Sequence, residues 1–254
     1  MLRELLTRLR QGQRTMRYPD GPAVLPDRFR GRPELSAGMC PAGCQACAAP
    51  CPTGAVTVSG GRVALDMGRC LFCGECAAAC PEARIRLSGE HRLAAWTRDG
   101  LRLPGTPPTP RPAIPHLHLF GRSLAFRQVS AGGCNACEAD INVLSTIAFD
   151  LGRFGIQIVA SPRHADGLLV TGPVTENMTL ALEKTYRALP PPRLVIAVGA
   201  CAISGGPYAD HPEAHNGAAS VLPVDLFIPG CPPHPLTILD GLLQLKKAAR
   251  QTPS

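Results

Sequence analysis

Aromatic residues are scarce in this chain of 254 residues, making up 4% of the sequence. They are not interleaved with Lys or Arg, so the sequence does not predict a platform on which nucleic-acid bases stack. The formal charge of +7 also leaves out any anionic cofactor that cysteines hold. We therefore expect no nucleic-acid partner.

Long hydrophobic runs are missing as well. No segment approaches the roughly 18 apolar residues of a membrane span. Residues 1–20 lack the uninterrupted apolar core and the small-residue cleavage site of a signal peptide. We therefore expect a cytoplasmic protein that is soluble or peripheral to a membrane, in which cysteines seldom form disulfides.

Cysteine, proline and glycine are abundant, with 12, 27 and 26 residues respectively. Closely spaced cysteine pairs in a cytosolic chain are typical of metal or cluster ligation. The prolines and glycines predict many turns and at least one linker. The length allows one large domain or two ordinary ones.

Eight cysteines form two related blocks that end in Cys51-Pro52 and Cys80-Pro81. The second block has the x2-x2-x3-Pro spacing of bacterial ferredoxins, and the first differs by one extra residue after Cys40. Three closely spaced thiolates hold one four-iron cluster, and the fourth reaches across to the other. We call the ligands expected for cluster A set A: Cys40, Cys44, Cys47 and Cys80. Set B, for cluster B, is Cys51, Cys70, Cys73 and Cys76. Structural zinc is the alternative, although zinc sites seldom use this spacing.

The remaining four cysteines each follow a short apolar, strand-like run. Cys134 and Cys137 lie in a glycine-rich turn, whereas Cys201 and Cys231 come from two later turns. We expect these four, called set C, to hold one further 4Fe-4S cluster, cluster C, which assigns all twelve cysteines. Unrelated buried thiols are the alternative.

Strand and helix patterns alternate after residue 117. The expected strands are 124–130, 156–160, 167–171, 194–199 and 224–228, and the expected helices are 138–152, 176–188 and 235–249. Such alternation predicts an α/β flavodoxin-like domain with a mainly parallel sheet. Ligands of such sheets collect at the carboxyl ends of strands, where set C lies in loops.

Residues 36–90 are expected to form an α+β two-cluster ferredoxin-like domain, with a hairpin between 55–58 and 62–65. Residues 91–116 form an expected proline-rich linker to the domain at 117–254, which keeps two separate cores. Residues 1–35 predict an amphipathic helix and an extended arm. The helical stripe of Leu2, Leu5, Leu6 and Leu9 suits a membrane surface or a partner's groove, or else packs on its own domain.

Several segments carry a family resemblance. Residues 117–254 resemble the cluster-bearing small subunit of energy-converting nickel–iron hydrogenases and its relative in respiratory complex I. The matching segments are 133–138, 161–166, 171–175, 199–201 and 229–233. Residues 1–90 resemble the two-cluster ferredoxin-like subunit of the same complexes, so two normally separate subunits are expected to be fused.

The spacing of Cys134 and Cys137 separates the two relatives, because complex I small subunits place these cysteines side by side. The resemblance to the hydrogenase-4 and formate-hydrogenlyase type implies an oxidoreductase subunit that relays electrons through three 4Fe-4S clusters. It implies a nickel–iron large-subunit partner that holds the hydrogen-activating centre, with further membrane and electron-transfer subunits. The expected location is peripheral, on the cytoplasmic face of the inner membrane.

Two other functions stay open at this point. One is a complex I-like quinone oxidoreductase subunit, and the other is a free-standing ferredoxin-like carrier or redox sensor. Glu138 is a candidate proton-carrying or interface residue, because it follows Cys137 directly. A carboxylate at the start of a helix is, however, favoured in any case.

Overall fold

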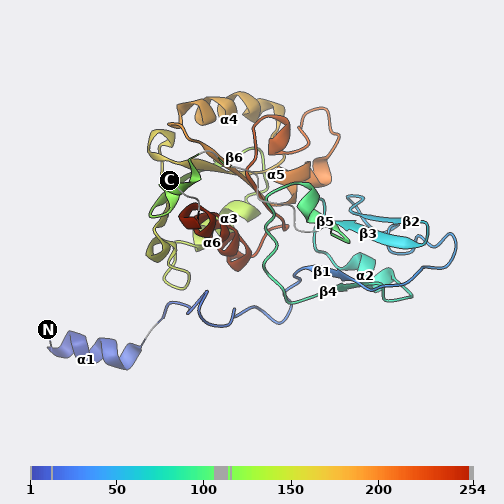
Figure 1. Ribbon diagram of the computed structural model, residues 1–254, viewed down its shortest axis with the longest axis horizontal. Coiled ribbons are helices and arrows are strands. Elements are labelled where there is room, and N and C mark those ends of the chain that lie inside the picture. The colour runs from blue at the N-terminus through green and yellow to red at the C-terminus, as the bar shows by residue number, and fades with distance from the viewer. Residues whose placement is uncertain (1, 13, 106–113, 115, 252–254) are drawn as a thin grey trace.

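A computed structural model describes residues 2–12, 14–105, 114 and 116–251, and its C-terminal half is built on a five-stranded sheet (Figure 1). The strands are β6 (Leu124–Ser130), β7 (Ile156–Ile158), β8 (Gly167–Thr171), β9 (Leu194–Val198) and β10 (Leu226–Ile228). All neighbours pair in parallel, in the order β10-β9-β8-β6-β7. This is the flavodoxin-like order, which confirms the expected α/β domain.

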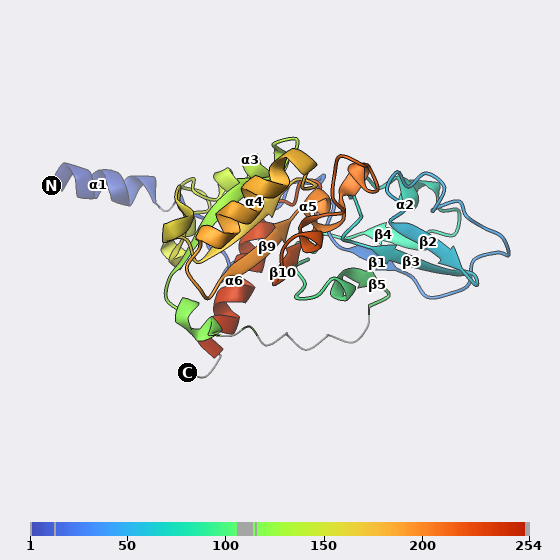
Figure 2. The ribbon, with the colours of Figure 1, turned by 90° about the horizontal axis from the view of Figure 1, so that it is seen from above.

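Helices cover both faces of this sheet (Figures 1 and 2). They are α3 (Ala136–Val143), α4 (Glu176–Ala188), α5 (Ala200–Ser204) and α6 (Pro235–Gln251). Side chains of a strand alternate between faces. In β8, Leu168 and Val170 join the buried cluster of α4 and α5, whereas Leu169 joins that of α3 and α6. The central strands β8 and β9 are buried at every residue, as their continuous apolar sequences predict.

The expected helix 138–152 is much shorter than predicted. Helix α3 ends at Val143, and a 3₁₀ turn follows at Leu151–Phe154. Thr146 Oγ1 donates a hydrogen bond of 2.7 Å to the Val143 carbonyl, which competes with continuation of the helix. The turn that results buries both Leu144 and Leu151.

The N-terminal half is a small α+β unit with antiparallel strands. Its elements are β1 (Pro33–Leu35), β2 (Val56–Ser59), β3 (Arg62–Asp66), α2 (Glu75–Ala79), β4 (Ile85–Leu87) and β5 (Arg102–Leu103). Strand β1 pairs with β4, and β2-β3-β5 form a second sheet. The hairpin expected around residues 55–65 is confirmed, because β2 and β3 pair across Gly60 and Gly61, whose positive φ angles suit a tight turn.

The two halves share a core, contrary to the expectation of two separate cores. One buried cluster contains Leu65 and Leu101 of the N-terminal half together with Val170 and Ile203 of the C-terminal half. Ser204 Oγ donates to the Gly68 carbonyl at 2.9 Å. Within the expected linker 91–116, β5 pairs with β3, and Ala95 forms a bridge with Phe227. Linker residues 106–113 and 115 lie outside the described residues.

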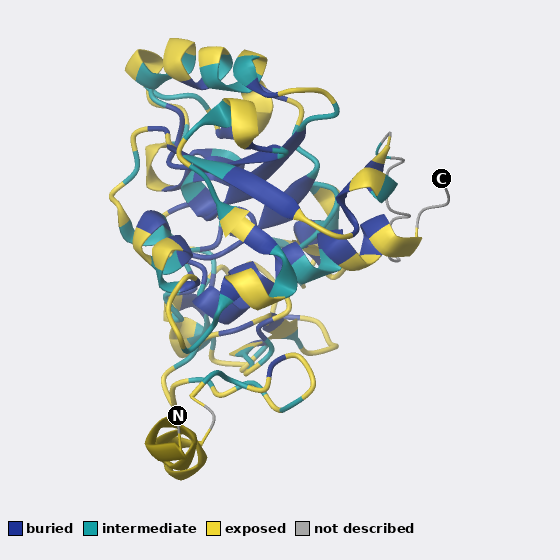
Figure 3. Ribbon diagram, turned by 90° about the vertical axis from the view of Figure 1, so that its left-hand side faces the viewer, coloured by how far each residue is buried: buried dark blue, intermediate teal, exposed yellow. Residues whose placement is uncertain are grey.

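An N-terminal helix, α1 (Leu2–Gln11), extends away from the sheet, and an arm without helix or strand follows at residues 14–32 (Figure 1). Every described residue of α1 is exposed (Figure 3), so its leucines do not pack on their own domain. None of the described helices has both the length and the apolar character needed to cross a bilayer.

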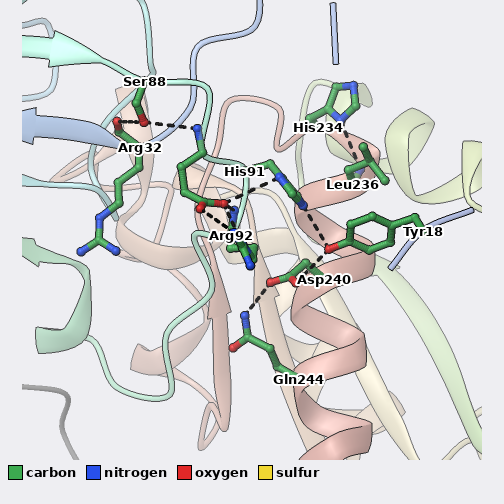
Figure 4. Close-up of polar contacts among 10 residues, drawn as sticks. Tyr18, Arg32, Ser88, His91, Arg92, His234, Leu236, Asp240 and Gln244 are labelled. Atoms are coloured by element: carbon green, nitrogen blue, oxygen red, sulfur yellow. Dashed lines mark hydrogen bonds and ion pairs between the residues drawn. The ribbon is translucent and has the colours of Figure 1, made fainter. Parts of the chain in front are cut away.

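The arm is held by a buried polar network (Figure 4). Tyr18 Oη donates to Asp240 Oδ1 of α6 at 2.9 Å and lies 3.0 Å from His91 Nε2. Burial and the neighbouring Asp240 carboxylate raise the pKa of Tyr18, so it stays a proton donor. Arg153 binds the Tyr18 carbonyl at 2.9 Å. The arm is therefore docked on the C-terminal half by specific contacts.

Asp225 makes stability depend on pH. Burial raises its pKa to about 6, although the hydrogen bond that its carboxylate accepts from the Val195 N–H lowers the pKa. The folded chain thus keeps this proton to a higher pH than the unfolded chain, whose Asp pKa is about 3.9. The stabilisation is complete below that value and is lost as the pH rises through about 6.

We expect the wild type to lose roughly 1–2 kcal/mol relative to an Asp225→Asn variant as the pH rises from about 5 to about 8. Anaerobic thermal unfolding at several pH values measures the gap between the two apparent Tm values. A gap that stays constant with pH would contradict the raised pKa.

Candidate functional site

All twelve cysteines are free, and the structure gathers them into three groups. The charge of one thiol affects the pKa of another only when the two are close, so these effects show which cysteines are neighbours. In set B, burial raises the pKa of Cys70 to about 12, and the charges of Cys76, Cys51 and Cys73 add to this. Cys51 therefore lies with the second block, as expected for the fourth ligand of a ferredoxin-type block.

Set A shows the reciprocal crossing. Burial raises the pKa of Cys47, and Cys80 of the second block is the strongest charged neighbour, followed by Cys40 and Cys44. Cys40 is followed by the one extra residue of the first block. Its side chain is buried at 8% exposure, and its N–H donates to the Gly61 carbonyl at 2.7 Å. The hairpin thus anchors Cys40 near the other three.

Set C lies at the carboxyl ends of β6, β9 and β10. Burial raises the pKa of Cys201 to about 11, with further contributions from Cys231 and Cys134. Burial also raises the pKa of Cys137, as do Glu138 and the other three thiols. The sequence places all four in loops, but Cys137 and Cys201 belong to the first turns of α3 and α5.

Position 199, two residues before Cys201, requires glycine. It has a φ of +91°, and an added Cβ would lie 2.6 Å from Cys137 Sγ. Any larger residue would displace the thiol that comes from the other strand. The glycine therefore lets the β6 and β9 loops approach each other at the site.

The donor chemistry fits 4Fe-4S clusters. Backbone N–H groups donate to the sulfurs of Cys51, Cys70 and Cys80 at 3.2–3.3 Å, and such bonds stabilise cluster thiolates. Burial raises the pKa of Cys51, but hydrogen bonds from the backbone of Thr53, Val56 and Ala55 and from the Thr53 side chain outweigh burial, so the pKa is lowered. No three His, Cys, Asp or Glu side chains of the described residues converge on a single metal ion. In a four-iron cube, by contrast, each thiolate binds an iron of its own.

The three sets lie next to one another in the order A, B, C. Burial raises the pKa of Cys76 in set B, and the charge of Cys47 in set A is one of those that add to this. Burial raises the pKa of Cys231 in set C, and Cys73 of set B is one of the two thiols that add to this. A cavity of about 430 Å³, lined by Phe72, Cys231 and His234, lies between the loop that carries Phe72 and the loop that carries Cys231.

Glu138 is buried beneath set C. It is 5% exposed, and Thr171 Oγ1, at the end of β8, donates to its Oε1 at 2.7 Å. Its charge raises the pKa of Cys137 more than any other charged neighbour does. The side chain is thus held next to Cys137 by a hydrogen bond, and a role in carrying protons stays a prediction.

Arg30 is a site residue that sequence reasoning missed. Its guanidinium, on the arm, donates to the carbonyls of Phe72 and Cys73, in the loop that carries two cysteines of set B. The arm also stacks Phe29 edge-on against His234, three residues after Cys231. The conspicuous Arg30-Gly31-Arg32-Pro33 stretch is the signal that could have found it.

Known proteins resemble the C-terminal half. The family described as "NADH ubiquinone oxidoreductase, 20 Kd subunit" matches residues 134–245. A probable membrane-bound hydrogenase subunit, mbhJ, of Pyrococcus furiosus is 44% identical over 132 residues, which are 52% of this chain and 79% of the relative.

Two further relatives carry different names. Formate hydrogenlyase subunit 7 of Escherichia coli is 44% identical over 120 residues, which are 47% of each chain. An NADH-quinone oxidoreductase subunit of Clostridium beijerinckii is 43% identical over 116 residues, 45% of this chain and 69% of the relative. With 79% of the Pyrococcus relative covered at this identity, the chain belongs to the family of the 20-kDa subunit of NADH:ubiquinone oxidoreductase, a family of oxidoreductase subunits.

Proposed function

We propose that this chain is the electron-transfer subunit of a multisubunit, membrane-associated nickel–iron hydrogenase, with three 4Fe-4S clusters. The observation that carries the proposal is the contiguous order of cysteine sets A, B and C across the shared core. The x2 spacing of Cys134 and Cys137 and the similarity to a membrane-bound hydrogenase subunit favour this branch of the family.

Bound at sets A, B and C, the clusters would supply one-electron transfer. The chain's own residues hold the sulfurs, donate hydrogen bonds to them and keep water away. Cys47, Cys70 and Cys76 are buried, so those sites are shielded from solvent. Burial and N–H···S bonds are the means by which a protein tunes such centres.

The N-terminal half fits a two-cluster ferredoxin-like domain at residues 36–90, fused to the family domain at 117–254. The support is the crossing of Cys51 and Cys80 between the two blocks, together with the antiparallel pairing of β1 with β4 and of β2 with β3. In this proposal, 91–116 connects the domains, and residues 1–35 attach the whole to other surfaces.

The partner proposed for set C is a large subunit with a nickel–iron centre. Cys134 and Cys231 are exposed, whereas Cys40, Cys47, Cys70 and Cys76 of the other sets are buried. An exposed set requires a cover if its cluster is to exchange electrons without contact with water. Since all twelve cysteines are assigned, the hydrogen-activating metal belongs on the covering chain.

A quinone-linked, complex I-like subunit is the second candidate, favoured by family relatives that are named as NADH-quinone oxidoreductase subunits. The two functions differ in the partner. A copurifying large subunit with two CxxC pairs indicates the hydrogenase, and one without them indicates the quinone-linked complex. A chain that purifies alone supports a free-standing carrier or redox sensor and overturns both.

The purified chain should carry about twelve irons, four in each of three clusters. Iron analysis combined with anaerobic EPR of the reduced protein measures this content. A content near eight would remove one of the three sets, and zinc in place of iron would overturn the cluster assignment altogether.

Peripheral association with the cytoplasmic face of a membrane is proposed to involve α1. Leu2, Leu5 and Leu9 are 59–79% exposed, on a helix that also carries Arg3, Arg8 and Arg10. Deletion of residues 2–11 should move the protein from the membrane fraction to the soluble fraction while the iron content stays unchanged.

The deletion ends before Met16, whose N–H binds the Ala148 carbonyl at 2.9 Å, so the arm keeps its anchor. A milder variant, Leu5→Ser with Leu9→Ser, keeps the helix's charge and should show the same change. If both variants fractionate like the wild type, α1 does not attach the protein.

A further inference from the structure

A second cavity, of about 870 Å³, lies between α6, the arm and the Gly152–Gly155 turn, away from the cysteine sets. Six of its thirteen lining residues are Arg or Lys, and one is acidic. We call it the basic cavity and define it by Arg122, Arg153, Lys246, Lys247, Arg250 and the acid Asp240. Its volume is within the range of small-molecule sites.

The charges of this cavity are not balanced from within. The sixth cation, Arg92, pairs with Glu90 through two bonds of 3.0 Å. The carboxylate of Asp240 accepts bonds from Tyr18 and Gln244 (Figure 4). Among the described residues, the five defining cations have no carboxylate partner, so an anion would complete the cavity.

Two of these cations have side chains that are free to bind, and the buried Lys246 is held in place. Lys246 is 4% exposed, and its Nζ donates to the carbonyls of Arg122 and Phe154. Burial lowers its pKa, and so does the charge of Arg250. Arg122 and Lys247 are exposed, and their side chains make no hydrogen bond or ion pair with the described residues. An incoming anion would therefore meet one fixed cation, Lys246, and two unpaired donors at the edge of the cavity.

The surroundings of the basic cavity show which anion it suits. Leu243 and Phe154 give it an apolar side. Pro19 of the arm lines it, and the arm runs from here back to the exposed leucines of α1. Ile147, next to the arm's anchor at Ala148, is 71% exposed. Figures 1 and 2 place α1 and the end of α6 away from the β1–β5 unit.

We propose that the basic cavity binds the phosphate-bearing headgroup of an anionic phospholipid. Guanidinium groups match phosphate geometry through paired hydrogen bonds, and the ammonium groups of Lys246 and Lys247 add point charges. The apolar side accommodates the start of an acyl chain, and the exposed leucines of α1 offer a separate contact with the membrane. This site does not depend on the electron-transfer function.

The test compares two double variants of the full chain. Arg122→Gln with Lys247→Gln removes the two unpaired donors of the cavity. Lys184→Gln with Arg187→Gln removes the same charge from α4, on the opposite face of the sheet. Both keep α1, so its contribution to membrane binding is equal, and iron content checks that both fold.

The measurement is flotation with phosphatidylcholine vesicles that do or do not contain phosphatidylglycerol. We expect the cavity variant to bind the anionic vesicles about 10- to 30-fold more weakly than the wild type, and the α4 variant to bind unchanged. Inorganic pyrophosphate should compete with the anionic vesicles for the wild type.

Three results would overturn the proposal. Equal losses in both variants would indicate general charge attraction rather than a site. Pyrophosphate binding without preference for anionic vesicles would assign the cavity to free phosphate. Unchanged vesicle binding with loss of copurifying subunits in the cavity variant would assign it to a protein.

Discussion

Replacement of Cys201 by alanine should remove about four of about twelve irons and abolish electron exchange with the large subunit. Cys201 lies in the first turn of α5, directly after β9, and contributes a thiol that no neighbouring cysteine can replace, because all the others are assigned. The charges that act most strongly on Cys201 are those of Cys231 and Cys134, so the loss should be confined to set C. Iron analysis and EPR of the reduced, anaerobic protein measure the remaining clusters.

Cys231→Ala should give the same result, since it removes another ligand of the same set. Alanine is preferable to serine for this test, because a serine oxygen can itself bind iron. Cys76→Ala is the matched comparison in set B, where different EPR signals should disappear. If Cys201→Ala retains all the iron, or loses a signal that Cys76→Ala also loses, the membership of set C is wrong.

The sequence predicted the parallel sheet well because its central strands β8 and β9 are buried at every residue. Strands β6 and β8 have the predicted limits, since runs such as Gly167–Thr171 consist of residues that all point into the two cores. The end of α3 was missed, since it depends on the side-chain bond of Thr146 and on tertiary burial of Leu151. Neither leaves a periodic pattern.

Sets A and B were predicted from the spacing of the two cysteine blocks, and set C from the position of its cysteines after strand-like runs. The contacts between the two halves could not be predicted from the sequence. Contacts such as Ser204 with Gly68 and Tyr18 with Asp240 join residues 136 and 222 positions apart. Nothing in the local sequence of either residue of such a contact specifies the other residue. The shared core and the docked arm are therefore visible only in the folded structure.

Set B has the central place in the row of sets, which gives Cys73 a distinct role. Cys73 is the thiol of set B whose charge reaches Cys231 of set C. In the proposed relay, set C serves the large subunit, and the external redox partner is reached through sets A and B. The loss of cluster B should therefore interrupt the path in its middle.

Replacement of Cys73 by alanine should damage cluster B and reduce electron transfer to the external partner to background. Hydrogen–deuterium exchange at the metal centre of the large subunit should survive, because it requires no net electron delivery. Glu75→Gln is the matched control, since it is exposed in the same turn and holds no iron. This variant should keep both activities and all three clusters.

Assembly has to be verified first, because the loss of a cluster can unfold the part of the chain that holds it. The shared core makes this check more important, since Cys70 and Cys76 belong to the same buried cluster as Val170 and Ile203. Copurification of the large subunit and an intact cluster C signal establish that the Cys73→Ala complex is assembled. If such a complex loses exchange and electron transfer to the same degree, the order A, B, C does not describe the path of electrons.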